Sequence, residues 1–255
     1  MKICRFSLEN RTSWGVLNDD LIYPFENLNF DDNFSDFINP SNFIKKNAVN
    51  FLPPVIPSKI VCVGRNYSEH AAELGNAVPK EPLLFLKAPS SLITDGDAIV
   101  IPKQSSQVEH EGELAIVISR NCKNLTENDN PFDYIFGYTC LNDVTARDLQ
   151  RNDVQFTRAK SFDTFCPIGA LVETKLNVSD IHVTTKVNGV IKQDGRTSQM
   201  VFSVPFLVRY ISNQMTLIAG DVIATGTPSG VSKLENGDIC EVEIEGIGTL
   251  QNPVK

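Results

Sequence analysis

The stretch Val108-Glu-His-Glu-Gly-Glu-Leu-Ala-Ile-Val117 joins an apolar run to three glutamates at alternate positions. Side chains of an extended strand alternate between the two faces of a sheet, so we expect Glu109, Glu111 and Glu113 to project to the same side. Gly112 has no side chain and is expected to leave the backbone open to a ligand. The stretch therefore predicts a buried strand that carries acidic side chains at its start.

Such a group of carboxylates is mutually repulsive unless a cation neutralises it. Asp143, in the run LNDVTARDLQ, adds a further carboxylate. Oxygen ligands favour magnesium, manganese or calcium over zinc, and three carboxylates leave positions on the ion open for water and a chelating substrate. The alternative is a solvated strand end without a metal. Spacing alone also leaves open which two of Glu109, Glu111 and Glu113 would be ligands.

Composition limits the classes of protein to which the chain can belong. Its 255 residues, of which 42% are hydrophobic, are enough for one large core with or without a small appended domain. A net charge of −8 excludes the basic surface typical of proteins that bind nucleic acid or membranes. The first residues contain no secretory signal and no run is long enough to span a membrane, so we expect a cytoplasmic protein. Six scattered cysteines without a CxxC pair are predicted to be buried thiols.

Two regions differ in their patterns. Residues 1–55 contain short alternating runs and an Asn/Asp/Phe-rich stretch, which predict a small N-terminal domain joined through the extended connector FLPPVIP to a main domain of residues 56–255. The main domain contains helical patterns near His70, at 145–152 and up to about 213. Strand-like runs dominate it, so the predicted fold class is α+β, mostly β. These runs are KIVCVG, DAIVIP, ELAIVIS, FGYTCLNDV, KVNGVIK, DVIATG and ICEVEIEG.

Several blocks together resemble the fumarylacetoacetate hydrolase family, in the same order and over about 60–250. They are KIVCVGRNYSEHAAELG, EHEGELAIVI, LNDVTARDLQ, AKSFDTFCPIG, KVNGVIKQDG and GDVIATGTPSGV. The resemblance implies a mixed β-sandwich roll, a homodimer, and a magnesium or manganese ion held by Glu111, Glu113 and Asp143. It also implies activity on small oxo-acids, at carbon–carbon bonds next to a carbonyl group.

The run Arg65-Asn-Tyr-Ser-Glu-His70-Ala-Ala-Glu73 is the second candidate for catalysis. Residues three apart on a helix are neighbours, so Glu73 can hydrogen-bond His70, fix its tautomer and make it a general base. The alternative is a surface histidine with an ion-pair neighbour. In the family that the chain resembles, the matching pair activates water, and we assign Arg65 to substrate binding.

Four further residues match the family's substrate site. Arg147 and Gln150 lie four and seven positions after Asp143, which predicts that all three share one face of a helix. Lys160 matches the family's active-site lysine and, with Gln150, is expected to stabilise an oxyanion. Thr227, in the Gly-rich run TGTPSG, could hold a substrate carboxylate. The alternatives are a fold-stabilising ion pair for Arg147 and a simple tight turn for TGTP.

Together these features predict a metal-dependent hydrolase of a small 2,4-dioxo acid, an acylpyruvate such as fumarylpyruvate or acetylpyruvate. The substrate would chelate the ion through its 2-oxo carboxylate, and His70 would deprotonate a water molecule for attack on the distal carbonyl. The same site could instead decarboxylate or tautomerise oxaloacetate, or isomerise or decarboxylate a catechol-pathway dienedioate. A protein that binds oxo-acids without turnover is the alternative outside enzymes, although it would not need the histidine–glutamate pair.

Overall fold

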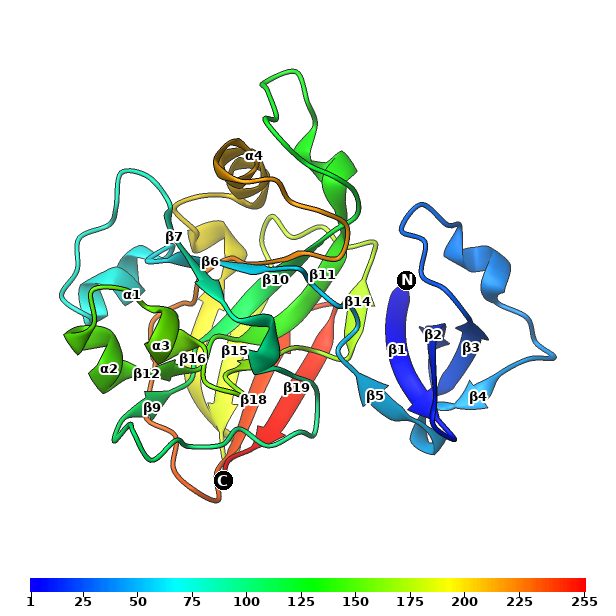
Figure 1. Ribbon diagram of the computed structural model, residues 1–255, viewed down its shortest axis with the longest axis horizontal. Coiled ribbons are helices and arrows are strands. Elements are labelled where there is room, and N and C mark those ends of the chain that lie inside the picture. The colour runs from blue at the N-terminus through cyan, green and yellow to red at the C-terminus, as the bar shows by residue number, and fades with distance from the viewer.

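The computed structural model describes all 255 residues. Figure 1 shows a main body with a lobe of N-terminal strands at one side. The strands are β1 (Lys2–Leu8), β2 (Arg11–Asn18), β3 (Leu21–Phe25), β4 (Ile44–Lys45), β5 (Asn50–Leu52), β6 (Ile60–Gly64), β7 (Leu83–Lys87), β8 (Leu92–Ile93), β9 (Val108–Glu109), β10 (Gly112–Ile118), β11 (Ile135–Asn142), β12 (Thr145–Ala146), β13 (Cys166–Pro167), β14 (Leu171–Glu173), β15 (His182–Val187), β16 (Val190–Arg196), β17 (Val222–Ala224), β18 (Ile239–Ile244) and β19 (Gly248–Pro253). The helices are α1 (Ser68–Glu73), α2 (Arg147–Asn152), α3 (Thr157–Lys160) and α4 (Val204–Gln214), and the 3₁₀ helices are η1 (Phe34–Phe37), η2 (Lys46–Ala48), η3 (Pro89–Ser91), η4 (Pro131–Tyr134) and η5 (Thr197–Gln199).

The largest sheet runs through both parts of the molecule. Its order is β4-β3-β2-β1-β14-β11-β10-β17-β6-β7, with β5 paired to β1. The N-terminal strands join the main body where β1 pairs antiparallel with β14, with Ile3 opposite Val172. The β17 and β6 strands are parallel, whereas β10 and β11 are antiparallel, so the sheet is mixed.

A second sheet, with the order β16-β15-β18-β19, packs against β10 and β11 of the first sheet. The β10 strand is buried on both faces. Leu114 and Ile116 belong to the core that also contains Val183 and Val242 of the second sheet, whereas Ala115 belongs to the core on the opposite face. The prediction of a mostly β, mixed two-sheet fold with a small N-terminal part is confirmed.

The local patterns account for most of these elements. The run KVNGVIK forms the β15–β16 hairpin, in which Asn188 and Gly189 both have positive φ, as a tight hairpin turn requires. The strand predicted for DAIVIP is wrong, because Ile99 makes only an isolated bridge to Val254 near the chain's end. The β7, β19 and α3 elements were not predicted from the sequence. All six cysteines are free and buried, as predicted, and no helix has the length and apolar character needed to cross a membrane.

The expectation that Gly112 leaves the backbone open to a ligand is wrong. A Cβ atom at this position would lie 2.1 Å from Oγ1 of Thr185 and 3.2 Å from Cγ1 of Val242. The missing side chain therefore lets β10 approach the second sheet closely.

A buried carboxylate anchors the connector that leads into β6. Asp221 is fully buried and accepts hydrogen bonds from the backbone N–H groups of Ser58 and Ile218, at 3.0 and 2.9 Å, and from the Ser58 hydroxyl at 2.7 Å. It also accepts from the backbone N–H and the ammonium group of Lys59. These bonds fix the start of β6 beside β17.

We expect Asp221→Ala to lower the free energy of unfolding by about 3 kcal/mol or more, because it removes a fully buried carboxylate that accepts five hydrogen bonds, one of them from an ammonium group. Thermal and denaturant unfolding would measure the loss. The control is Asp20→Ala, since Asp20 is exposed and pairs only with the half-exposed Lys46, and it should cost about 1 kcal/mol or less. Equal losses for the two variants would contradict the anchoring role of Asp221.

Candidate functional site

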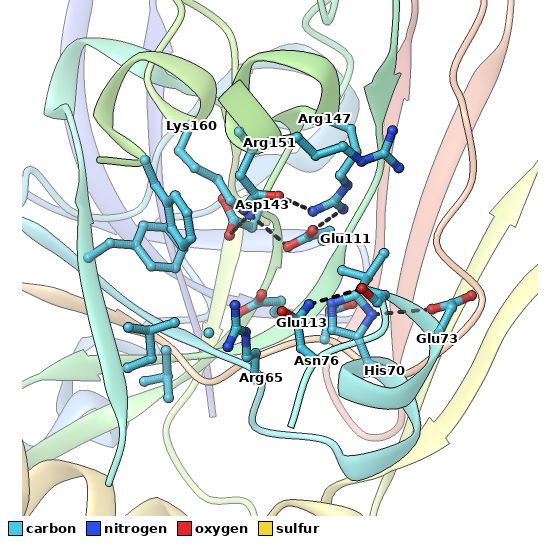
Figure 2. Close-up of a pocket in the computed structure, with 18 residues that line it drawn as sticks. Arg65, His70, Glu73, Asn76, Glu111, Glu113, Asp143, Arg147, Arg151 and Lys160 are labelled. Carbon is cyan, nitrogen blue, oxygen red and sulfur yellow. Dashed lines mark hydrogen bonds and ion pairs between the residues drawn. The ribbon is translucent and has the colours of Figure 1, made fainter. Parts of the chain in front are cut away.

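A cavity of about 430 Å³ opens between α1, α2, α3 and the adjacent ends of β10 and β11 (Figure 2). The ten residues selected from the sequence all line it, although they come from five separate segments of the chain. They are Arg65, His70, Glu73, Glu111, Glu113, Asp143, Arg147, Gln150, Lys160 and Thr227.

Pairing between β10 and β11 brings the three carboxylates together. Glu111 immediately precedes β10, Glu113 lies within it, and Asp143 immediately follows β11. Gly112 is opposite Asn142 in this antiparallel pair, and the N–H of Asp143 donates to the carbonyl of Glu111 at 2.8 Å. All three side chains are buried, and a carboxylate oxygen from each lies within 4.8 Å of the others.

The three carboxylates differ in how their charges are balanced. Burial raises the pKa of Glu113 well above its usual value, and the nearby Asp143 and Glu111 raise it further. Its carboxylate accepts one hydrogen bond, from the N–H of Gly226 at 2.7 Å, and has no ion-pair partner. Burial would also raise the pKa of Glu111, but the positive charges of Lys160 and Arg147 bring it below its usual value.

These residues fit a divalent metal ion. The donors are all carboxylate oxygens, which magnesium and manganese prefer, and they are close enough together to share one ion. Glu113 forms no ion pair, so an ion held by Glu111, Glu113 and Asp143 would offset the burial and the repulsion that raise its pKa.

Two buried lysines contact the carboxylates. Lys160, at the end of α3, places its ammonium 2.8 Å from Oε2 of Glu111 and 2.6 Å from Oδ2 of Asp143. Burial would lower the pKa of Lys160, but Asp143 and Glu111 raise it above its usual value. The same ammonium lies over the ring of Phe85 at 5.1 Å from the centroid. Lys87 donates to Oδ1 of Asp143 at 2.7 Å.

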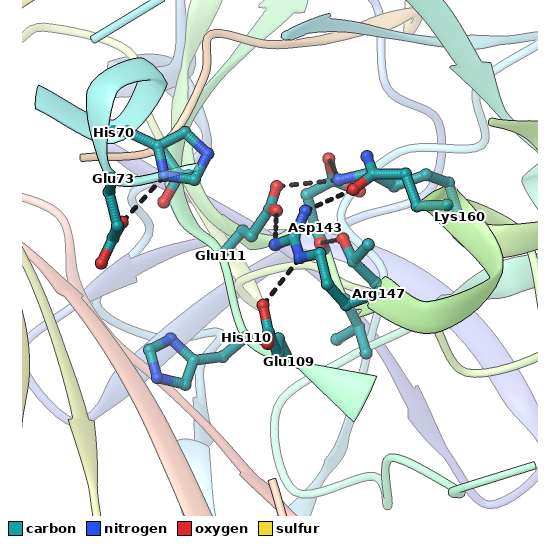
Figure 3. A network of polar contacts seen from close by, with 12 residues as sticks. His70, Glu73, Glu109, His110, Glu111, Asp143, Arg147 and Lys160 are labelled. Carbon is teal, nitrogen blue, oxygen red and sulfur yellow. Dashed lines mark hydrogen bonds and ion pairs between the residues drawn. The ribbon is translucent and has the colours of Figure 1, made fainter. Parts of the chain in front are cut away.

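Arg147 forms the ion pairs that were the alternative interpretation from the sequence (Figure 3). Its Nε donates to Glu109 at 2.7 Å, its Nη2 to Glu111, and its Nη1 to Oε1 of Gln150 at 2.5 Å. The prediction that Asp143 shares a helical face with Arg147 and Gln150 is wrong. The helix α2 begins at Arg147, and the residues just before it form the extended β12, which pairs with β9.

The His70–Glu73 pair lies on α1, across the cavity from Lys160 (Figure 2). His70 is 5% exposed, and its Nδ1 is 3.3 Å from Oε2 of Glu73. The Glu73 carboxylate also accepts from the N–H of Gly230 at 3.1 Å, which ties α1 to the loop after β17. Nε2 of His70 has no protein partner, so this nitrogen is free to exchange a proton.

Thr227 and Arg65 differ in their bonding. The Thr227 hydroxyl donates to the carbonyl of Gly112 at 2.9 Å and accepts from Nε2 of Gln193 at 2.7 Å, so it closes the loop in which it lies. Arg65 is half-buried, has a positive φ of 58°, and has no ion-pair or hydrogen-bond partner. An unpaired charged side chain at a cavity wall, on a residue with a strained backbone, is typical of a ligand-binding position.

Sequence reasoning assigned no specific role to two buried polar residues of this region. Lys87 supports Asp143, and Gln193 accepts from the N–H of Gly112 at 3.0 Å while its amide donates to Thr227. Both lie at inward-facing positions of strands, where alternation predicts an apolar residue. A polar side chain at such a position is the signal that could have identified them.

Comparison with known proteins gives the family. The model of the fumarylacetoacetate (FAA) hydrolase C-terminal domain matches residues 59–255, and that of the Rv2993c-like N-terminal domain matches residues 1–37. An uncharacterized protein of Archaeoglobus fulgidus is 55% identical over 205 residues, covering 80% of this chain and 82% of the relative. Oxaloacetate tautomerase YisK of Bacillus subtilis is 43% identical, over 78% of this chain and 70% of the relative. The mitochondrial oxaloacetate tautomerase fahd2 of Xenopus laevis is 41% identical, over 84% of this chain and 70% of the relative.

Solved structures show the same architecture. A 5-carboxymethyl-2-hydroxymuconate delta-isomerase from Mycobacterium smegmatis aligns with a TM-score of 0.89 at 38% identity, over 100% of this chain and 99% of the other. Fumarylpyruvate hydrolase from Pseudomonas aeruginosa, in complex with Mn²⁺ and pyruvate, aligns with a TM-score of 0.74 at 29% identity, over 79% and 90%. The resemblance found in the sequence is thus confirmed, and the chain belongs to the fumarylacetoacetate hydrolase family.

Proposed function

We propose that this protein is a cytoplasmic, homodimeric enzyme that uses magnesium or manganese to interconvert the keto and enol forms of a small 2-oxo dicarboxylic acid such as oxaloacetate. The observation that carries the proposal is the pairing of the buried His70 with Glu73, across one cavity from three clustered carboxylates. Two relatives named oxaloacetate tautomerase are 43% and 41% identical to this chain, whereas the fumarylpyruvate hydrolase of known structure is 29% identical. These identities support tautomerisation over hydrolysis of an acylpyruvate.

The metal part of the proposal follows from the donor set. When held by Glu111, Glu113 and Asp143, a divalent ion supplies positive charge that polarises the 2-oxo group of the substrate. The manganese in the P. aeruginosa fumarylpyruvate hydrolase structure supports an ion of this kind.

The proton transfer is assigned to His70. With Nδ1–H donated to Glu73, Nε2 carries the lone pair that accepts a proton from C3 of the keto acid. The electrons of the broken C–H bond form the C2–C3 double bond, and negative charge develops on the C2 oxygen. The imidazolium then returns the proton to that oxygen, so no water or other reactant is consumed. Glu73 stabilises the imidazolium between these two steps.

Other residues of the cavity would hold the substrate. Lys160 is a buried ammonium, suited to stabilising the developing negative charge, and Gln150 is oriented by Arg147 beside it. We assign Arg65, which has no protein partner, to the carboxylate remote from the 2-oxo group. Arg147 and Thr227 complete the proposed substrate site as parts of its walls.

Hydrolysis of an acylpyruvate is the second candidate. Its support is the structural likeness to fumarylpyruvate hydrolase and the same His70–Glu73 pair, which could deprotonate water as readily as a carbon acid. The difference lies in the attacking group, because hydrolysis requires a water molecule beside Nε2 of His70 and tautomerisation does not. Assays with both kinds of substrate therefore separate the two functions.

The metal site predicts a selective effect on stability. We expect Mg²⁺ or Mn²⁺ at about 100 times Kd to stabilise chelator-treated protein by about 2.7 kcal/mol, which is measurable as a rise in Tm. Glu113→Gln should abolish most of this rise, yet leave the metal-free protein at least as stable, because one repelling charge is gone. Glu109→Gln is the matched control and should keep most of the rise, since Glu109 pairs with Arg147. A full metal response in Glu113→Gln would contradict the assignment.

Loss of the base should remove catalysis without removing the metal. We expect His70→Ala to lower kcat for oxaloacetate tautomerisation by about 10²–10⁴, and Glu73→Gln to lower it less. The control His182→Ala removes a half-exposed histidine and should leave kcat unchanged. If His70→Ala loses only acylpyruvate hydrolysis and keeps full tautomerisation, the second candidate replaces the first.

The assignment of Arg65 predicts an effect that depends on the substrate. Arg65→Leu should raise KM for oxaloacetate by about 10- to 100-fold, the scale of a lost charge-assisted hydrogen bond, and Arg65→Lys should restore part of it. For enolisation of a monocarboxylic 2-oxo acid, such as 2-oxobutanoate, KM should change little. Arg158→Leu, on α3 but outside the cavity, is the control. Equal effects on both substrates would show that Arg65 does not bind the second carboxylate.

A further inference from the structure

The side chain of Lys87 is completely buried behind the three carboxylates. Its ammonium donates to Oδ1 of Asp143 at 2.7 Å and to the carbonyl of Val144 at 3.2 Å. Lys87 is not among the residues that line the cavity, whereas Lys160 and Arg147 are. A substrate in the cavity can therefore contact Lys160 and Arg147, but not Lys87.

The strand that carries Lys87 explains this position. Every second residue of β7 points to the same face of the strand, so Leu83, Phe85 and Lys87 share one face. In the pairing with β6, Lys87 lies opposite Ile60. Leu83 and Phe85 form part of the cavity wall, and Lys87 is the next residue on the same face, below the cavity floor. An apolar residue would be expected there, so the lysine has to be stabilised by a specific partner.

The charges around the cavity floor are close to balanced without any bound ion. Four buried carboxylates lie together, namely Glu109, Glu111, Glu113 and Asp143, and three buried cations contact them, namely Lys87, Arg147 and Lys160. Arg147 forms ion pairs with both Glu109 and Glu111, and Lys160 is shared between Glu111 and Asp143. Among the four carboxylates, Lys87 contacts only that of Asp143. It binds Oδ1, whereas Lys160 binds Oδ2.

We propose that Lys87 is a positioning residue that acts as a built-in counter-ion for Asp143, keeping the metal-free site folded and weakening its affinity for the divalent ion. The inference rests on the metal site of the proposed function and adds to it a residue that never touches substrate. Removing the ammonium leaves Asp143 buried without its own cation, so the metal-free protein loses stability. A bound divalent ion supplies the missing charge, so the metal-loaded protein loses much less.

A thermodynamic cycle makes the consequence for binding quantitative. If a variant is less stable than the wild type without metal and nearly equal with metal, its native state must bind the metal more tightly by the same factor. A residue that only fills space would lower stability equally in both states and leave the affinity unchanged. Stability and affinity together therefore separate a counter-ion from a packing residue.

The test uses the full-length protein with Lys87→Met, which keeps the length of the side chain and removes its charge. Unfolding is followed in chelator and in saturating Mg²⁺, and the Kd for Mg²⁺ is measured by calorimetry. We expect Lys87→Met to lower Tm in chelator by about 6 °C or more, to recover most of that loss in Mg²⁺, and to bind Mg²⁺ at least about 10-fold more tightly than the wild type. Lys87→Arg should retain the stability and affinity of the wild type.

The matched control is Lys59→Met. Lys59 pairs with the fully buried Asp221 at the connector, away from the cavity, so its loss should lower Tm equally with and without Mg²⁺. An equal loss in both states for Lys87→Met, or an affinity no tighter than that of the wild type, would overturn the inference. If neither the wild type nor Lys87→Met responds to Mg²⁺, the metal site itself fails as well. A metal response in the wild type together with an unchanged affinity in Lys87→Met would refute the role of Lys87 alone.

Discussion

Four carboxylates buried side by side set the constraint around which the centre of this protein is organised. Burial penalises each charge and proximity makes them repel, so the arrangement requires cations built in beside them, cations bound from solution, or protonation of a carboxylate. The chain supplies Arg147, Lys160 and Lys87 from three different elements. Glu113 is the one carboxylate of the four without an ion pair, and its hydrogen-bond donor is the backbone N–H of Gly226. A further positive charge would therefore be most stabilising beside Glu113.

The two-sheet fold makes this arrangement rigid. The first sheet places the triad at the adjoining ends of β10 and β11, where the register fixes the backbone of Asp143 against that of Glu111. The second sheet supports the same point, because Gly112 packs against Thr185 and Gln193 binds both Gly112 and the loop of Thr227. Substrate specificity can then vary through the loops and short helices at the rim without disturbing the acidic centre.

The cavity divides its chemistry between two walls. One wall holds the carboxylates and their cations, which are suited to binding an anionic oxo-acid together with a metal. The other wall is α1, a helix of six residues that carries the His70–Glu73 pair and is tied to the loop after β17 through Glu73 and Gly230. In the proposed function this pair transfers the proton, and its place on an element separate from the carboxylates would let one scaffold serve relatives named as tautomerases, isomerases and hydrolases.

The sequence by itself determined the mostly β fold, through alternation in runs such as ELAIVIS, and it identified the family through several blocks in one order. Spacing alone could not choose among Glu109, Glu111 and Glu113, because all three share one parity, and only the family resemblance favoured Glu111 and Glu113. The tertiary structure adds the proximity that no spacing contains, since pairing of β11 with β10 brings Asp143 close to these two glutamates. The role of Lys87 was also hidden, because a strand's local pattern contains no information about which distant residue its side chain will meet.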